Sequence, residues 1–288
     1  MLQSPTLMYK ITGEDIPARL RELPQPPKAL YLRGELPAFA DYKYLTVVGS
    51  RRFSNYGKDA CEKLLNGLAG YPIVIVSGLA LGIDAIAHRA ALRAGLPTVG
   101  MPGSGLDPGV IAPRTNALLA EEILKSSGAL LSEYEPKARV YPSNFPERNR
   151  LMVGLSDAVL IIEAGERSGT LITARMATDY NRDLYVVPGP IFSPHCAGSN
   201  RFMKEGAMPV CSSDDLLTEL GFETKKNAQR SFDFSDTEQL IVDLLHEPCS
   251  RDALIRESGL SAQECTTLLV AMEIKGLIRE HMGEIHLA

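Results

Sequence analysis

The sequence predicts an α/β protein with one parallel sheet covered by helices on both faces, followed by a small C-terminal winged-helix domain. Short continuous apolar runs, such as 45–48 and 73–76, are typical of strands buried on both faces. These runs alternate with helical periods, a pattern that requires right-handed crossovers and a parallel sheet. Three short helical periods and a hairpin pattern follow a polar stretch after residue 222 and indicate the second domain.

The totals describe an ordinary globular chain of 288 residues, 45% hydrophobic and 23% charged. This length favours one large domain and one small one. We expect a proline-rich lead-in with a short strand over 1–40 and the main domain over 41–222. A linker over 223–235 and the winged-helix domain over 236–288 complete the chain.

The elements of the main domain follow in order from these patterns. Prolines exclude a long helix from the lead-in, which ends in a strand over 29–34. The predicted strands that follow are 45–48, 73–76, 98–101, 129–131, 158–162 and 184–187. The predicted helices are 56–68, 83–93, 116–125, 148–155 and 171–180, and a last unit pairs 207–210 with 214–220.

The C-terminal part is predicted to hold helices over 237–246, 251–257 and 262–275 and a hairpin of 277–280 with 284–287. A winged helix usually reads duplex DNA through a basic recognition helix. Here that helix carries Glu264 and Glu273 against Lys275 alone, so we interpret it as a protein contact or a weak accessory element. Residues 230–288 hold five Lys/Arg against eleven Asp/Glu, so any anion should bind the main domain.

Several classes of protein are excluded. The five cysteines are odd in number, scattered and never spaced as CxxC, and the histidines lack metal-ligand spacing, so we expect neither disulfides nor a metal. No apolar run reaches the ~20 residues that a membrane span needs, and no signal peptide is visible at the start. We therefore expect a cytoplasmic protein without a membrane partner.

The first main strand ends in Gly49-Ser50-Arg51-Arg52. In an open α/β sheet, ligands bind beyond the carboxyl ends of the strands. Arginine beside glycine and serine favours an anion, because the cation supplies charge and donors while glycine permits close approach. The alternative is an ordinary strand end with exposed arginines.

Glycine and serine recur where predicted helices begin, in the turns 49–51, 77–84, 103–107 and 163–170. Such turns present backbone N–H groups at the positive end of a helix dipole, which suits phosphate. The alternative is that turns between strands and helices simply need glycine. Because the P-loop and GxGxxG fingerprints are absent, no nucleotide cofactor is expected.

Two local groupings leave alternatives open. Asp84 and His88 stand at i,i+4, a general-base geometry in principle, although Asp84 can simply complement a helix N-terminus. In 145–150, Arg148 and Arg150 fall in the predicted first turn, where they need an anionic partner. That partner is either a ligand or one of the carboxylates Glu147 and Glu163.

Seven motifs in order resemble the DNA-processing protein A (DprA/Smf) family over about 16–222, and the tail from 236 resembles its winged-helix domain. The motifs are Val48-Gly49-Ser50-Arg51, Ser77-Gly78-x-Ala80-x-Gly82-Ile83-Asp84, Gly103-x-Gly105-Leu106-Asp107, Ser132-Glu133-Tyr134, Phe145-Pro146-x-Arg148-Asn149-Arg150, Ser168-Gly169-Thr170-Leu171-Ile172-Thr173-Ala174 and Val187-Pro188-Gly189.

The resemblance implies an extended Rossmann-like fold that binds single-stranded DNA without catalysis. It further implies a homodimer that protects incoming DNA and helps to load the RecA recombinase during natural transformation. The residues that it assigns to the strand-binding pocket are Gly49, Ser50, Arg51, Ser77, Gly78, Gly82, Arg148, Asn149, Arg150, Ser168, Gly169 and Thr170. Some relatives have lysine where this chain has Pro142 and Gly165, and fewer cations weaken DNA binding and flatten its salt dependence.

The leading hypothesis is thus a single-strand binding module whose charge comes mainly from Arg148, Arg150 and Arg52, with Arg51 the first residue to test. Bases could stack on Phe53, Tyr134 or Phe145. A second hypothesis is an enzyme similar to nucleoside-monophosphate phosphoribohydrolases, which needs Glu163 or Glu133 as its catalytic carboxylate. A third makes the tail a transcriptional regulator, and the acidity of that tail opposes it.

Overall fold

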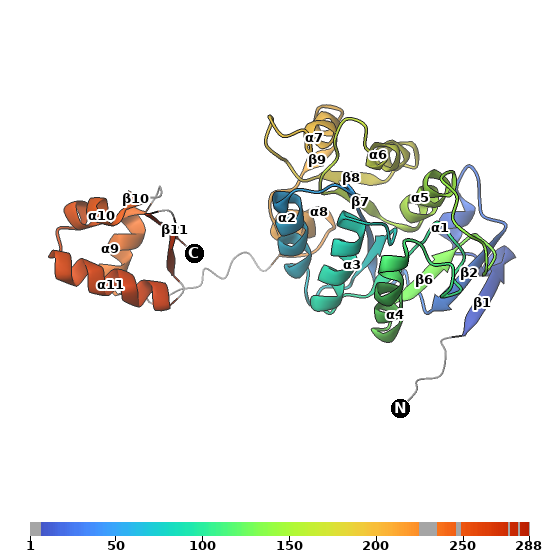
Figure 1. Cartoon of the computed structure of the whole chain (residues 1–288), viewed down its shortest axis with the longest axis horizontal. Coiled ribbons are helices and arrows are strands. Elements are labelled where there is room, and N and C mark those ends of the chain that lie inside the picture. Colours follow the sequence, from blue (N-terminus) through green and yellow to red (C-terminus); the bar gives the residue numbers. More distant parts are fainter. Residues whose placement is uncertain (1–6, 225–234, 246–248, 276, 282, 288) are drawn as a thin grey trace. The chain divides into compact units, whose positions relative to one another are not determined.

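The computed structural model describes residues 7–224, 235–245, 249–275, 277–281 and 283–287. The chain divides into two compact units, Met1–Thr224 (unit 1) and Lys225–Ala288 (unit 2), shown in Figure 1. Most of the expected linker, the expected helix end at residue 246 and residue 282 of the expected hairpin turn lie outside the described residues.

Unit 1 is built on one sheet, in which nine strands belong to the described residues, in the order β1-β2-β6-β5-β4-β3-β7-β8-β9. Strands β3 to β9 pair in parallel, whereas β2 runs antiparallel to both β1 and β6. The strands are β1 Met8–Thr12, β2 Ala29–Gly34, β3 Lys43–Val48, β4 Ile73–Ser77, β5 Thr98–Gly100, β6 Ala129–Ser132, β7 Ala158–Ile161, β8 Asp183–Val186 and β9 Met208–Pro209.

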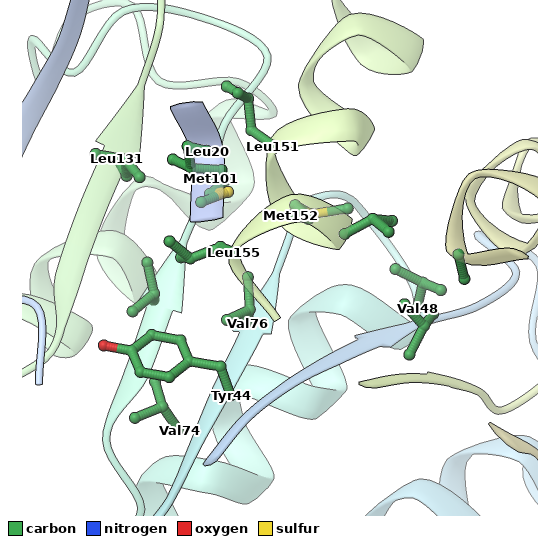
Figure 2. Packing of buried hydrophobic residues seen from close by; sticks show 14 of the residues in the cluster. Leu20, Tyr44, Val48, Val74, Val76, Met101, Leu131, Leu151, Met152 and Leu155 are labelled. Atoms are coloured by element: carbon green, nitrogen blue, oxygen red, sulfur yellow. The ribbon is translucent and has the colours of Figure 1, made fainter. Parts of the chain in front are cut away.

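The helices of unit 1 cover both faces of this sheet (Figure 1). They are α1 Ala18–Arg21, α2 Asn55–Asn66, α3 Ile83–Arg93, α4 Ala117–Lys125, α5 Asn144–Leu155, α6 Thr170–Asp179, α7 Ala197–Lys204 and α8 Ser213–Glu219. Leu45 and Val47 pack with α2, α3 and α8 on one face. Tyr44 and Val48 pack with α1, α5, α6 and α7 on the other, and Figure 2 shows Tyr44 in this second cluster with Leu155 of α5. The alternation along β3 explains why its apolar run is continuous.

The order of the strands reverses at β3. From β3 the chain moves through β4 and β5 to β6, then crosses back to β7 on the other side of β3 and continues to β8 and β9. Such a reversal opens a crevice at the carboxyl ends of the two central strands, here β3 and β7.

Unit 2 has the winged-helix architecture that its sequence predicts. It contains α9 Asp236–Leu244, β10 Cys249–Ser250, α10 Arg251–Ser258, α11 Ala262–Ile274, β11 Ile278–His281 and β12 Glu284–Leu287. The sheet order is β10-β12-β11, and a core that includes Ile241, Leu254 and Leu269 joins the helices. Lys275, which ends α11, is bound to Glu238 with 2.6 Å between Nζ and Oε1. The recognition helix therefore exposes Glu264 and Glu273, and the lysine at its end is paired with a carboxylate.

The structure confirms the fold class and corrects three details. The sheet is mixed rather than wholly parallel, because β2 and the unpredicted edge strand β1 are antiparallel. Helix α1, also unpredicted, lies within the proline-rich lead-in and buries Leu20. Helix α5 begins at Asn144 rather than at residue 148, since Pro146 is tolerated in a first turn whose N–H groups lack helical partners.

Candidate nucleic-acid interface

A cleft of about 710 Å³ lies at the reversal of the sheet. Its walls come from the turns after β3, β7 and β8 and from α5. Nine of the thirteen residues assigned to the site from the sequence line it: Gly49, Ser50, Arg51, Arg52, Arg148, Asn149, Ser168, Gly169 and Thr170. The other four, Ser77, Gly78, Gly82 and Arg150, lie outside the lining.

The turn that carries Arg51 and Arg52 is fixed through its backbone. Ser50 N–H donates to the carbonyl of Glu163 at 2.8 Å, and the carbonyl of Ser50 accepts from Ile83 N–H at 3.3 Å. Ser50 Oγ accepts from Arg52 N–H at 3.0 Å, which closes the turn locally. Both arginine side chains are exposed and form no ion pair with any residue in the described part of the chain. The hydrogen-bonded turn thus holds two exposed arginines that lack an anionic partner among the described residues.

Two glycines let this turn approach α3. A Cβ on Gly82, whose φ is +84°, would lie 2.4 Å from the Ser50 carbonyl and 2.6 Å from the Cα of Arg51. A Cβ on Gly49 would lie 2.7 Å from Ile83. Gly82 therefore does not line the cleft, but its lack of a side chain allows the arginine turn to pack against the start of α3.

The Glu163 side chain binds Ser54, which follows the two arginines at the end of the same turn. Its carboxylate is fully buried and accepts from Ser54 N–H at 2.9 Å and from Ser54 Oγ at 2.5 Å. Ser54 is also the N-cap of α2, since its Oγ accepts from Gly57 N–H. With both oxygens engaged and no exposed surface, Glu163 is unavailable as a general acid or base, which opposes the enzyme hypothesis.

Arg148 lies in the floor of the cleft and is only 4% exposed. Its Nη1 donates to the carbonyls of Gly78 and Met101, and a Cβ on Gly78 would collide with it. Burial lowers the pKa of Arg148 to about 10, so the guanidinium stays charged at neutral pH. Buried Asp84 lies close enough for their charges to interact, and it accepts from Gly78 N–H at 3.2 Å. Ser77, the residue before Gly78, is buried, and its Oγ donates a hydrogen bond to the carbonyl of Val47.

The structure therefore corrects the expected partners of the cations on α5. The carboxylate beside Arg148 is Asp84, and Arg150 is bound to Glu133 and to the carbonyl of Gln25. Both arginines fall in the second turn of α5, away from the positive end of its dipole. Neither Glu147 nor Glu163 fills the expected role, because Glu147 bonds Tyr134 and Glu163 bonds Ser54.

Asp84 and His88 do not form the acid–base pair that their spacing allows. The Nδ1 atom of His88 lies 2.7 Å from Thr98 Oγ1, and both residues are buried. Burial lowers the pKa of His88 to about 3. Burial raises the pKa of Asp84, while the charge of Arg148 and the N–H groups of Ala80 and Gly78 oppose that rise. Asp84 thus complements the start of α3, as the structural alternative expects.

The apolar wall of the cleft carries the contact between Arg51 and Phe145. The Arg51 guanidinium lies 4.7 Å from the centroid of the Phe145 ring. Of the other aromatic candidates, Phe53 is 38% exposed in the arginine turn, whereas Tyr134 is bonded to Glu147 away from the cleft. An aromatic face beside free cations suits a ligand with both planar bases and phosphates.

The start of α6 forms the opposite wall. Thr170 N–H donates to Ser168 Oγ at 3.2 Å, and Asn149 Nδ2 donates to Thr173 Oγ1 at 3.0 Å, which ties α5 to α6. Exposed Arg167 also lines this wall and was not among the expected site residues, although it directly precedes Ser168. Pro194 and His195 line the rim and were likewise missed, because they follow β8 far along the chain.

Four arginines and one carboxylate line the cleft: Arg51, Arg52, Arg148 and Arg167 against Asp84. Pro142 and Gly165, two uncharged residues, lie in the same lining. In the parts of the chain that the structure describes, no group of His, Cys, Asp or Glu could hold a metal ion.

Known protein families include one whose model covers most of this chain. A family model described as DNA recombination-mediator protein A matches residues 8–221, and a DprA winged-helix model matches residues 225–284. The chain belongs to the DprA/Smf family. Members similar to it include Protein Smf of Escherichia coli, 36% identical over 92% of this chain and 73% of that protein. DNA processing protein DprA of Streptococcus pneumoniae is 38% identical over 74% of each chain.

Two solved DprA structures share the fold. That of Streptococcus pneumoniae DprA superposes with a TM-score of 0.68 at 36% identity over 75% of both chains. The structure of Helicobacter pylori DprA, which was solved to describe how that protein binds single-stranded DNA, superposes with a TM-score of 0.66. The two chains are 33% identical, over 73% of this chain and 95% of that one. Within the described residues, no helix is long and apolar enough to cross a membrane.

Proposed function

We propose that this chain binds single-stranded DNA in the cleft at the sheet reversal. The observation that carries the proposal is the pair of exposed arginines, Arg51 and Arg52, on a turn that is fixed by hydrogen bonds to Ile83 and Glu163. A rigid support lowers the entropy that the protein loses on binding a phosphate. The single-strand binding mode studied for the Helicobacter pylori relative supports the same ligand class.

The lining favours a single strand over a duplex. Apolar side chains, including Phe145, Met152 and Ile172, share the cleft with the arginines. A duplex presents its phosphates outside and hides its base faces, so it offers nothing to these apolar walls. A single strand presents both phosphates and unstacked bases, and cationic grooves with aromatic platforms are typical of proteins that bind it.

The binding is proposed to be non-catalytic. The enzyme hypothesis needs Glu163 or Glu133, and Glu163 is buried against Ser54 while Glu133 is bound to Arg150. Neither residue lines the cleft. The phosphoribohydrolase alternative therefore has neither of its glutamates in the cleft, and Asp84, the carboxylate that lines it, accepts from Gly78 N–H beside Arg148.

We further propose that the chain acts as a homodimer that protects incoming strands and helps RecA to assemble on them during natural transformation. The family description as a recombination mediator and the DNA-processing relatives support this role. Sedimentation equilibrium tests the dimer. RecA filament formation on single strands, with and without this protein, tests the recombinase step.

The binding proposal is tested by fluorescence anisotropy with a labelled single strand and its duplex. Arg51→Glu should abolish single-strand binding, and wild type should bind the duplex more weakly. Lys125→Glu changes the net charge equally at the end of α4, an exposed site outside the cleft, and should leave binding intact. Equal binding of the strand by wild type and Arg51→Glu would exclude the cleft as the DNA site.

A further inference from the structure

The loop between β8 and α7 carries two large apolar side chains at the corner of a tight turn. Ser193 N–H donates to the Pro190 carbonyl at 3.0 Å, which places Ile191 and Phe192 at the two central positions. Ile191 is 80% exposed and Phe192 is 93% exposed. Turn corners favour small or polar residues, and adjacent exposed apolar side chains are a feature of interaction sites, so this pair is a candidate contact surface.

This turn is held firmly on both sides. Asn200 of α7 makes two hydrogen bonds to Gly189, at 3.2 Å from its N–H and 2.9 Å to its carbonyl. Tyr56 of α2 donates its hydroxyl to the Pro188 carbonyl, and Cys196 N–H donates to the Ser193 carbonyl at 3.1 Å. The apolar pair is therefore presented on a fixed support rather than on a free loop.

The same loop forms part of the cleft. Pro194 and His195 line the rim, and His195 Nδ1 lies 2.9 Å from the carbonyl of Arg52. Phe192 precedes Pro194 by two residues, so their Cα atoms are at most about 7 Å apart. The backbone of Phe192 is thus close to the rim, and its side chain is not part of the cleft lining.

We propose that Phe192, supported by Ile191, stacks on a base of the bound strand just outside the cleft. This proposal rests on the proposed single-strand binding. Phosphates bound by Arg52 and Arg167 bring the strand to the rim, and the next base passes the Pro190–Ser193 turn. A planar partner that covers an exposed phenyl ring removes the most apolar surface from water. Every base has such a planar face, so stacking on the ring does not depend on the DNA sequence.

The test compares a short oligothymidine of about four nucleotides, which occupies the cleft alone, with one of about sixteen. Phe192→Ala should weaken binding of the longer strand by about fivefold or more and leave the shorter strand unchanged. Phe192→Trp keeps an aromatic ring at this position and should bind the longer strand as tightly as wild type does. Leu118→Ala removes another highly exposed apolar side chain, from α4, and should change neither affinity. A strand with 2-aminopurine near the cleft should show a fluorescence change on binding wild type that is absent with Phe192→Ala.

The outcomes separate this proposal from the one on which it rests. Wild-type affinity of Phe192→Ala for the longer strand would overturn the stacking role and leave the cleft proposal standing. An equal loss for both strands, or a loss of dimer in sedimentation with unchanged strand affinity, would also overturn it. Failure of wild type to bind either strand would overturn both proposals.

Discussion

The guanidinium of Arg51 lies 4.7 Å from the centroid of the Phe145 ring, so a cation and an aromatic face share one wall of the cleft. Arg51 comes from the turn after β3 and Phe145 from the first turn of α5, which lie far apart in the sequence. In the proposed complex with single-stranded DNA, this pair supplies two kinds of interaction, because an arginine attracts phosphate and an aromatic ring stacks with a base.

Phe145→Leu tests the aromatic half of this pair. It keeps an apolar side chain in the wall and removes the ring, so single-strand affinity should fall by about 1 to 3 kcal/mol. The salt dependence should stay the same, since no charge is lost. Anisotropy titrations at several salt concentrations measure both quantities. Unchanged affinity would show that bases do not use this ring.

Pro142→Lys tests whether one more positive charge in the cleft lining strengthens the binding of single-stranded DNA. Pro142 is exposed in the lining, so a lysine there should strengthen single-strand binding and steepen the log–log salt slope by about 0.7. Ser126→Lys at the C-cap of α4, outside the lining, adds the same charge and should change the slope less. Gly165 is the poorer site, because its Cβ would lie 2.9 Å from the Pro194 carbonyl. Equal effects of the two lysines would contradict a localised site.

Glu163→Gln tests whether this carboxylate supports the arginine turn. The amide offers one acceptor to the two donors of Ser54, so unfolding free energy should fall by about 1 to 3 kcal/mol and strand affinity should fall with it. Tyrosine near-UV circular dichroism during urea unfolding reports unit 1 alone, because all ten tyrosines precede residue 225.

The control for Glu163→Gln is Glu166→Gln, which also removes one negative charge. Glu166 is exposed and lies in the turn that follows β7, so this variant should keep the wild-type free energy of unfolding. Neither wild type nor Glu163→Gln should release free base from AMP. Base release by wild type that disappears in Glu163→Gln would contradict the non-catalytic proposal.

His88 predicts a pH dependence of stability. Its folded pKa is about 3, whereas an unfolded histidine titrates near 6.5. Above about pH 6.5 neither state binds the proton. Between about pH 6.5 and 3 only the unfolded state binds it, so stability falls with falling pH by about 1.4 kcal/mol per unit.

His88→Gln removes this contribution. Urea unfolding of unit 1 between about pH 4 and 5.5 should therefore show a slope smaller than that of wild type by about 1.4 kcal/mol per pH unit. Identical slopes in the two proteins would show that His88 is protonated in the folded state.

Much of the fold could be predicted because buried parallel strands and their covering helices leave strong local patterns, as in Ile73–Ser77 and Ile83–Arg93. Strand β1 was missed because its exposed edge position leaves little apolar alternation. Its antiparallel pairing with β2 depends on tertiary contacts that no local pattern records.

For the candidate site, the sequence predicted residues that mostly line one cleft, but it predicted less of how each of them is bonded. The glycine turns mark the carboxyl edge of the sheet, and most of the expected residues line the cleft. Burial decides which cations are free, and burial is not visible in sequence: Arg148 is enclosed by Gly78 and Met101, and Arg150 is bound to Glu133. Arg167 was overlooked although the turn that contains it was recognised.

The most direct test of the account is the salt dependence of single-strand binding for one-residue variants. Arg51→Gln, Arg52→Gln and Arg167→Gln should each reduce the log–log slope by about 0.7, because each removes one phosphate contact. Arg150→Gln should leave the slope unchanged, since its guanidinium is bound to Glu133 outside the cleft. A slope that is the same in wild type and Arg51→Gln would contradict the assignment of the cleft as the DNA-binding site.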